Sequence, residues 1–154
     1  MRIVPESRWI SQAWKNGGGV THEIVRWPAG ADPYDVRISL ARDERDAPFS
    51  TFPGYRRWSF LVGPAPITLI EPGRRIQLVA PGDHIELPGE TALSCELPAG
   101  PTELFNVLAR PGLCVAGFGP IAHPIRFRFV LGTREAAVFD PPEVADTRDA
   151  IWVS

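Results

Sequence analysis

Proline and glycine interrupt this chain so often that almost no segment is long enough to form a helix. Together they account for 31 of the 154 residues, as 14 glycines and 17 prolines, well above their average share in globular proteins. They separate short runs rich in valine, isoleucine and aromatic residues, at a spacing of roughly ten residues. No long segment keeps the helical period without meeting one of them. The pattern predicts an all-β fold, a sandwich or barrel of short strands.

Length and charge limit the architecture and the partners. A chain of 154 residues predicts one domain over residues 1–154 with a substantial core. The net charge is -2, with 22% charged residues, so no basic field attracts nucleic acid or anionic lipid. No apolar run approaches the length of a membrane span, and the first residues lack the order of a secretory signal. We therefore expect a cytoplasmic protein without nucleic-acid or membrane partners.

Alternation of apolar and polar residues predicts the strands. In residues 34–41, Val36, Ile38 and Leu40 fall on one face, and Arg37, Ser39 and Ala41 on the other. Residues 57–63 predict a central strand, and further strands are expected over 21–27, 66–70, 75–79, 91–97, 102–110, 113–118 and 125–131. The charged residues 43–48 predict a solvated connection. Residues 136–139 and 150–153 are weaker candidates, separated by residues 141–143, and we expect a loosely held end.

Three consecutive glycines, Gly17 to Gly19, are the most unusual local feature. Glycine enters φ > 0 regions and lets the backbone approach another group closely, and ordinary turns need only one or two such residues. A triplet therefore predicts a turn whose backbone amides are presented to something. Lys15 and Asn16 bring a charge and an amide to its start. The alternative is a glycine-rich corner with solvated flanks, and no nucleotide-binding glycine pattern occurs here.

Residues that bind metals or perform catalysis are sparse. No H-x-H pair or H-E-x-x-H segment joins the three histidines, His22, His84 and His123. Two cysteines, Cys95 and Cys114, make no metal spacing and no disulfide framework, and Cys95 is expected to be buried and inert. His84 and Glu86, beside a Pro-Gly turn, would supply two metal ligands at most. The sequence therefore predicts no metal, no cofactor and no catalytic residue.

Four segments resemble signatures of the HutD/Ves family of small bacterial proteins. The first is Trp14-Lys15-Asn16-Gly17-Gly18-Gly19 with Thr21 and Glu23-Ile24. The second and third are Arg37-Ile38-Ser39-x-Ala41 and Pro48-Phe49-Ser50-x-Phe52-Pro53-Gly54-Tyr55-x-Arg57. The fourth is Gly100-Pro101-Thr102 followed by Phe105-Asn106-Val107-Leu108-x-Arg110. These segments cover most of residues 9 to 110 in the family's order.

The resemblance implies a cupin-type (RmlC-like) antiparallel β-barrel or sandwich, an architecture often described as two cupin halves in one chain. The turn-strand-turn rhythm from Pro81-Gly82-Asp83 to Leu87-Pro88-Gly89 is similar to that of cupins. The histidine cluster of enzymatic cupins is missing. Family members encoded with histidine-degradation enzymes are thought to govern that pathway by binding an intermediate such as formylglutamate.

Our first hypothesis is a non-enzymatic protein that binds a small anionic metabolite and tunes amino-acid catabolism. A pocket in a barrel mouth with a few convergent polar groups is the usual form of such a site, and arginine grips a carboxylate bidentately whereas lysine acts as a point charge. For each arginine alone, an exposed strand position is the alternative. The candidate ligand-binding residues are Lys15, Asn16, Gly17, Gly18, Thr21, Glu23, Arg37, Ser39, Phe49, Ser50, Arg57 and Asn106.

Two other functions stay open at this point. One is a cupin enzyme, metal-dependent or metal-free, that acts on a small carboxylate metabolite through His84, Glu86 and Glu23. The other is a protein–protein regulator that docks a partner enzyme through an apolar surface including Trp58 and Trp152. A homodimer is compatible with all three.

Overall fold

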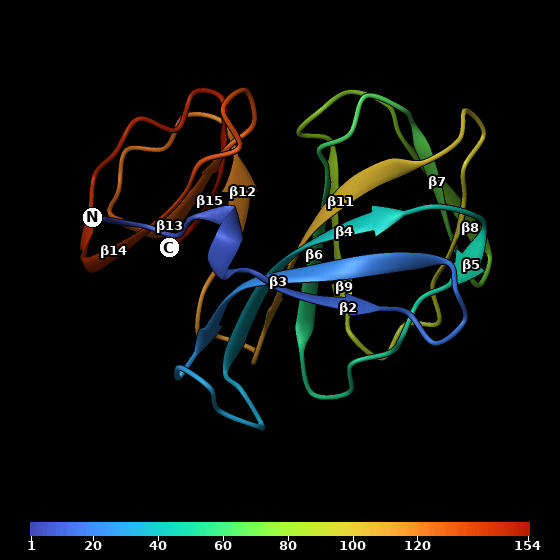
Figure 1. The fold of residues 1–154 in the computed structure, drawn as a ribbon, viewed down its shortest axis with the longest axis horizontal. Helices are drawn as coiled ribbons and strands as arrows, with labels where there is room; N and C mark the ends of the chain where they lie inside the picture. Colours follow the sequence, from blue (N-terminus) through green and yellow to red (C-terminus); the bar gives the residue numbers. More distant parts are fainter.

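The computed structural model describes all 154 residues as fifteen β-strands and one short 3-10 helix, η1 (Glu6–Arg8). The all-β prediction is confirmed. The strands form three antiparallel sheets, shown in Figure 1 with the six-stranded sheet between the other two. These sheets do not close into one barrel, so the sandwich is the better description of the two expected architectures. No helix in the structure has the length and apolar character that crossing a membrane requires.

The six-stranded sheet carries the residues discussed below. Its strands are, in spatial order, β2 (Ile10–Ala13), β3 (Gly19–Trp27), β4 (Val36–Asp43), β11 (Thr102–Ala109), β6 (Arg56–Leu61) and β9 (His84–Pro88). The long central strands β4 and β11 pair over eight residues, from Val36 opposite Ala109 to Asp43 opposite Thr102. This register fixes which side chains meet across the sheet.

Two smaller sheets flank the six-stranded one. The five-stranded sheet has the order β1 (Arg2–Ile3), β14 (Ala136–Glu143), β13 (Ile125–Val130), β15 (Ala150–Val153) and β12 (Ala116–Phe118). The four-stranded sheet has the order β5 (Ala47–Pro48), β10 (Ser94–Glu96), β7 (Ile67–Glu71) and β8 (Arg74–Leu78).

Strand alternation sends the two faces of the six-stranded sheet into different surroundings. On β11, Phe105 and Val107 join the main core, where the Phe105 ring stacks 4.9 Å from Phe129 of the five-stranded sheet. Leu104 points the other way and packs with Leu61 and residues of the four-stranded sheet. Asn106 lies on this same second face. The predicted alternation of residues 36–41 is confirmed, with Val36, Ile38 and Leu40 in the main core.

The expectation of a loosely held end was wrong. The end of the chain is firmly held, because β15 lies between β13 and β12 and both Ile151 and Val153 are fully buried. Residues 136–139 and 150–153 form two separate strands as predicted, but the first, β14, continues through Pro141 and Pro142 to Glu143. The apolar run of residues 150–153 is short, so the sequence gives little sign of a stable strand. The strand is stabilised by pairing with β13 and β12, which a local pattern does not show.

A β-bulge in β3 interrupts the alternation expected for residues 21–27. Glu23 pairs with Ser39, but the next pair is Val25 with Ile38, so the register shifts at Ile24. As a result Val25 joins the main core, although simple alternation placed it on the face of Thr21 and Glu23. Because of the bulge, Thr21 and Glu23 lie on the polar face of the sheet, whereas Val25 lies on the core face.

Replacing Phe129 by alanine should lower the free energy of unfolding by about 3–5 kcal/mol, because its fully buried ring joins the two sheets. Urea unfolding at equilibrium measures this loss. Val144→Ala is the control, since Val144 is 65% exposed and surface changes stay within about 0.5 kcal/mol. Equal small effects of both substitutions would contradict tight packing between these sheets.

Candidate functional site

A cavity of about 470 Å³ lies on the face of the six-stranded sheet that points away from the five-stranded sheet. Strands β2, β3, β4, β6 and β11 supply its floor, and the turn before β3 and the segment after β5 supply its walls. Its sixteen lining residues are Gln12, Ala13, Trp14, Lys15, Asn16, Thr21, Arg37, Ser39, Ala41, Pro48, Phe49, Ser50, Phe52, Arg57, Asn106 and Leu108. None of them is Asp, Glu, His or Cys.

A row of polar side chains crosses the floor. Asn106 on β11 lies opposite Ser39 on β4 and opposite Ser59 on β6. Its Oδ1 atom accepts a hydrogen bond of 2.6 Å from the Ser59 hydroxyl and one of 3.4 Å from Arg57. The Asn106 amide nitrogen has no partner within the protein and is therefore free to donate into the cavity.

Arg57 is the central charged group of the cavity. Only 7% of the residue is exposed, and the guanidinium donates to the Ser59 hydroxyl at 3.1 Å and to the Ser50 carbonyl at 3.5 Å. It lies over the rings of Phe49 and Phe52, at 5.1 and 5.7 Å from their centroids. No carboxylate lies within 4.0 Å of it, unlike most arginines of this chain. Burial lowers the pKa of Arg57 to about 10, so it stays charged at neutral pH.

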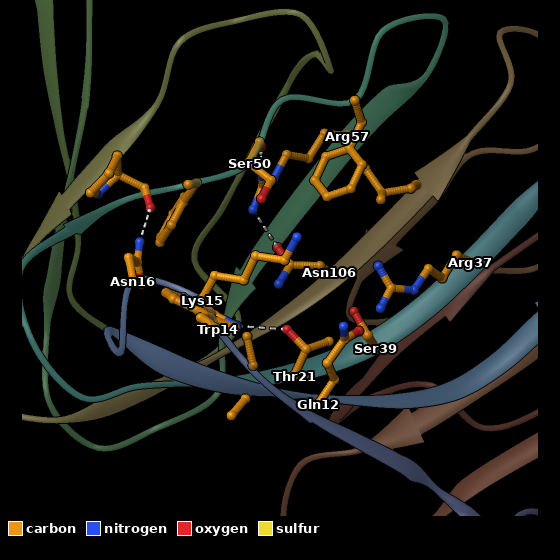
Figure 2. Close-up of a pocket in the computed structure, with 16 residues that line it drawn as sticks. Gln12, Trp14, Lys15, Asn16, Thr21, Arg37, Ser39, Ser50, Arg57 and Asn106 are labelled. Atoms are coloured by element: carbon orange, nitrogen blue, oxygen red, sulfur yellow. Dashed lines mark hydrogen bonds between the residues drawn. The ribbon is translucent and has the colours of Figure 1, made fainter.

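Arg37 forms a second positive wall, and Glu23 holds it in place. The Arg37 Nε donates to Glu23 Oε1 at 2.7 Å, and Arg26 donates to the same oxygen at 2.7 Å. Burial opposes ionisation of Glu23, but the hydrogen bonds from Arg26 and Arg37 hold its pKa below the usual value. Figure 2 shows Lys15, Arg37 and Arg57 extending toward the middle of the cavity from different sides.

The glycine turn closes one side of the cavity through Asn16 and Trp14. Asn16 Oδ1 accepts a hydrogen bond from the Gly18 amide at 2.8 Å, and its Nδ2 donates to the Pro48 carbonyl at 3.2 Å. The Trp14 indole donates to the Thr21 hydroxyl at 2.8 Å (Figure 2). Gly17 has φ +71°, which favours glycine. A Cβ on Gly18 would lie 2.6 Å from Ala47, so this glycine allows close packing.

The structure brings most of the candidate residues together. Nine of the twelve line the cavity: Lys15, Asn16, Thr21, Arg37, Ser39, Phe49, Ser50, Arg57 and Asn106. Gly17 and Gly18 shape the turn without lining the cavity, and Glu23 lines a neighbouring cavity of about 510 Å³ with Arg26 and Arg37. That any of them binds a ligand stays a prediction.

Sequence reasoning missed Gln12, Ala13 and Phe52, among other lining residues. Gln12 and Ala13 belong to β2, an edge strand of four exposed residues with no apolar alternation to reveal it. Phe52 stood within a segment of the family resemblance, and its aromatic ring beside Phe49 was the available signal. Leu108 was identifiable from its position two residues after Asn106 on a predicted strand.

Asp43 was expected in a solvated connection, and this was wrong. It is the last residue of β4, opposite Gly19 and Thr102, and is fully buried. Neither carboxylate oxygen has a hydrogen-bond partner. Burial raises the pKa of Asp43 to about 7, although the positive charge of Arg57 acts against the shift. Asp43 lies in a run of charged residues in the sequence, and this run concealed that Asp43 ends β4 on the same face as Arg37, Ser39 and Ala41.

Of the residues proposed for the two other functions, Glu23 reaches this cavity through Arg37, and the others do not line it. His84 stacks on Phe60 at 4.7 Å, and Glu86 forms an ion pair of 3.1 Å with Arg56. No group of three or more His, Cys, Asp or Glu side chains suited to a metal occurs in the structure. Trp58 is 3% exposed and belongs to the core, so its placement on a docking surface was wrong. Cys95 is buried as expected, and burial raises its pKa to about 11.

Comparison with known proteins gives a family match over most of the chain. The sequence profile described as HutD matches residues 6–139, which extends the likeness beyond residue 110. An uncharacterised 21.2 kDa protein in the hutC 3′ region of Pseudomonas putida is 36% identical over 99 residues. Those residues are 64% of this chain and 52% of that protein, so the match spans about half of the relative's length.

Two solved structures show the fold. HutD from Pseudomonas fluorescens SBW25 (formate condition) has a TM-score of 0.75 and 23% identity, and the alignment covers 99% of this chain and 92% of that one. A cupin domain of an XRE family transcriptional regulator from Enterobacter cloacae has a TM-score of 0.50 and 11% identity, covering 61% of this chain and 98% of that domain. The cupin-like fold is therefore confirmed.

Asn16→Ala should lower the free energy of unfolding by about 1–2 kcal/mol, because it removes two hydrogen bonds that hold the turn. Asn16→Asp is the matched variant, since it keeps the acceptor for the Gly18 amide and should recover part of the loss. Urea unfolding of both variants measures this. Two variants as stable as the original chain would show that the turn is held by other contacts.

Asp43→Asn should remove a pH dependence of stability. Because folding raises the pKa of Asp43 to about 7, the folded state binds a proton that the unfolded state releases above about pH 4. The stability from this group is therefore complete below about pH 4 and is lost as pH rises to about 7, by about 1.4 kcal/mol per pH unit. Urea unfolding at several pH values should show the original chain losing stability relative to Asp43→Asn. Parallel pH profiles would contradict the burial of an unpaired carboxylate.

Proposed function

This chain belongs to the HutD family, and we propose that it is a non-enzymatic protein that binds a small carboxylate metabolite in the cavity around Arg57. Through this binding it regulates amino-acid catabolism, with histidine degradation as the pathway. The metabolite is held by the side chains that line the cavity, and no cofactor takes part.

The observation that carries the proposal is a buried cation that no carboxylate contacts: Asp43 acts on Arg57 through its charge but forms no ion pair with it. Arg57 is almost fully buried and faces a cavity in which no acidic residue occurs. Burying a charge is costly unless an opposite charge or several hydrogen bonds compensate for it. The protein gives Arg57 two neutral acceptors, Asn106 and Ser59, at 3.4 and 3.1 Å, and a distant carbonyl. An incoming carboxylate would bring a negative charge into contact with the guanidinium and form stronger hydrogen bonds with it.

The remaining lining residues fit the same ligand class. The free Asn106 amide nitrogen donates to a carboxylate oxygen, and Lys15 adds a positive charge at the exposed mouth. Phe49, Phe52 and Trp14 provide an apolar wall for the carbon skeleton. A volume of about 470 Å³ is in the range of small-molecule sites. Together these groups favour a metabolite with a compact body and an anionic group.

The lining favours binding over catalysis. Serine, threonine and lysine side chains line the cavity, but a hydroxyl nucleophile needs an adjacent general base, and no His, Asp or Glu lines the cavity to act as one. Lys15 is the only charged lining residue besides the two arginines, and it lies at the solvent side. The groups that remain are hydrogen-bond donors on a fixed sheet, which suit recognition.

The pathway assignment rests on the family and on one relative. The Pseudomonas putida protein is designated by its position in the hutC 3′ region, and the family resemblance implies a link to histidine utilisation. Histidine-pathway intermediates that carry carboxylates, N-formyl-L-glutamate and urocanate, are therefore the first ligands to test.

Calorimetric titration of the purified protein with these two compounds at millimolar concentration should detect binding. Arg57→Leu should weaken the affinity by at least about 30-fold, because it removes one partner of a buried charge pair. Arg75→Leu is the matched control, since Arg75 is exposed and pairs with Glu96 at 2.7 Å, outside the cavity. The melting temperature of Arg57→Leu should move by only a few degrees.

Absence of heat with both compounds would remove the assigned ligand class. Unchanged affinity in a folded Arg57→Leu protein would remove the assigned site. Chemical conversion of either compound during the titration, followed by chromatography, would instead favour the enzyme alternative.

A further inference from the structure

We propose that Asp43 is the proton-binding partner of the Arg57 cavity, so that an anionic ligand and a proton are bound together. The inference rests on the proposed function and adds a regulation to it: affinity for the ligand depends on pH near neutrality. It assigns a role to a residue that does not itself line the cavity.

The placement of Asp43 is the first argument. It lies on the same face of β4 as Arg37, Ser39 and Ala41, which line the cavity, and continues that row under the glycine turn. Its side chain is fully buried, and neither carboxylate oxygen has a hydrogen-bond partner. A buried carboxylate in this state is stable only when it carries a proton or when a nearby cation compensates for its charge.

The charges that act on Asp43 identify that cation, although none of the groups that carry them forms a hydrogen bond with it. From β6, the positive charge of Arg57 favours the ionised form of Asp43, and from β11 the negative charge of Glu103 opposes it. Glu103 is itself held by Arg134, with Nη1 to Oε1 at 2.9 Å. From β10, Cys95 has a pKa raised to about 11 by burial and is neutral. Within its own segment, Arg42 and Glu44 pair with each other at 3.6 Å.

Arg45 and Asp46, the remaining charged neighbours in sequence, are engaged elsewhere. Arg45 donates to the Asn16 carbonyl at 3.1 Å, and Asp46 accepts a hydrogen bond from the Leu97 amide at 2.9 Å. Arg57 is therefore the cation on which the charge state of Asp43 depends, and it is also the cation that the proposed ligand occupies.

Binding at Arg57 and ionisation of Asp43 therefore oppose each other. A carboxylate ligand beside Arg57 cancels the positive charge that favours ionised Asp43, and adds a negative charge to the same buried region. Asp43 responds by taking up a proton, and by linkage the affinity for the ligand is highest where Asp43 is already protonated. The affinity falls as pH rises through about 7, which is the pKa of Asp43 in the free protein.

Calorimetry with N-formyl-L-glutamate tests this, because the carboxylates of this probe titrate near pH 4, far below the window of interest. The full chain is titrated at about pH 6, 7 and 8.5, in HEPES and in Tris, whose different heats of ionisation reveal proton uptake. We expect a fraction of a proton to be taken up at neutral pH. We expect affinity to fall by about threefold to tenfold from pH 6 to pH 8.5.

Asp43→Asn should bind the same probe without proton uptake and with a flat pH profile. Asp43→Val, which removes the polar group altogether, should behave in the same way if Asn disturbs folding. Asp46→Asn is the matched control, because Asp46 is an exposed acid three residues away, and it should keep the proton uptake of the original chain.

Each outcome decides the matter. Binding without proton uptake in the original chain would overturn the inference and leave the proposed function standing. Proton uptake that persists in Asp43→Asn and Asp43→Val would assign the proton to another group and also overturn it. Absence of binding at every pH would overturn the proposed function together with the inference.

Discussion

The burial of Arg57 is the constraint on which the rest of the site depends, because a guanidinium cannot remain in the interior unless its surroundings are built for it. Its positive charge explains why the polar Ser59 and Asn106 are buried in the middle of β6 and β11, and why Phe49 and Phe52 lie against the guanidinium. It also explains how Asp43 is tolerated in the interior without a hydrogen bond. The main core, a cluster of apolar side chains, lies on the opposite face of the same strands. One sheet thus separates a stabilising face from a polar face, and Arg57 sets the chemistry of the latter.

The parts of the site that lie on regular strands were predictable from the sequence. Alternation placed Arg37, Ser39 and Ala41 on one face, and the structure confirms that face. Alternation cannot give register, however, and only the pairing of β4 with β11 and of β11 with β6 brings Ser39, Asn106 and Ser59 into one row. The bulge at Ile24 changes the facing of β3 through a single extra residue, and no local pattern announces it. The prediction for Asp43 was wrong for a related reason. Its buried environment is formed by Gly19 and Thr102, which are remote from it in sequence.

The glycine turn shows how a correct local prediction can serve a different purpose from the one expected. The triplet was expected to present backbone amides, but the Gly18 amide is taken by the side chain of Asn16. Asn16 at the same time reaches Pro48, so it fastens the turn to the segment that carries Phe49 and Ser50. The glycines allow this close approach, and Trp14, Lys15 and Asn16 are the residues that the turn brings to the cavity. The side chains of the turn, and not its glycine amides, form this part of the cavity wall.

A cavity that contains donors and no acids has a consequence for how such a fold can be used. An enzymatic cupin obtains its positive charge from a metal held by histidines, and the charge is lost when the metal leaves. Here the charge belongs to Arg57 and stays at neutral pH, since its pKa is lowered only to about 10. Ligand binding at this site therefore cannot be turned off by loss of the cation. Only the identity and charge of the anions that compensate Arg57 can change. Two anions compete for this charge in the proposed scheme, a ligand carboxylate from solution and Asp43 from the interior. Because Asp43 ionises at about pH 7, the competition between Asp43 and the ligand carboxylate for Arg57 depends on pH near neutrality. In the proposed scheme, the affinity of the site responds to pH without a conformational change of the sheet.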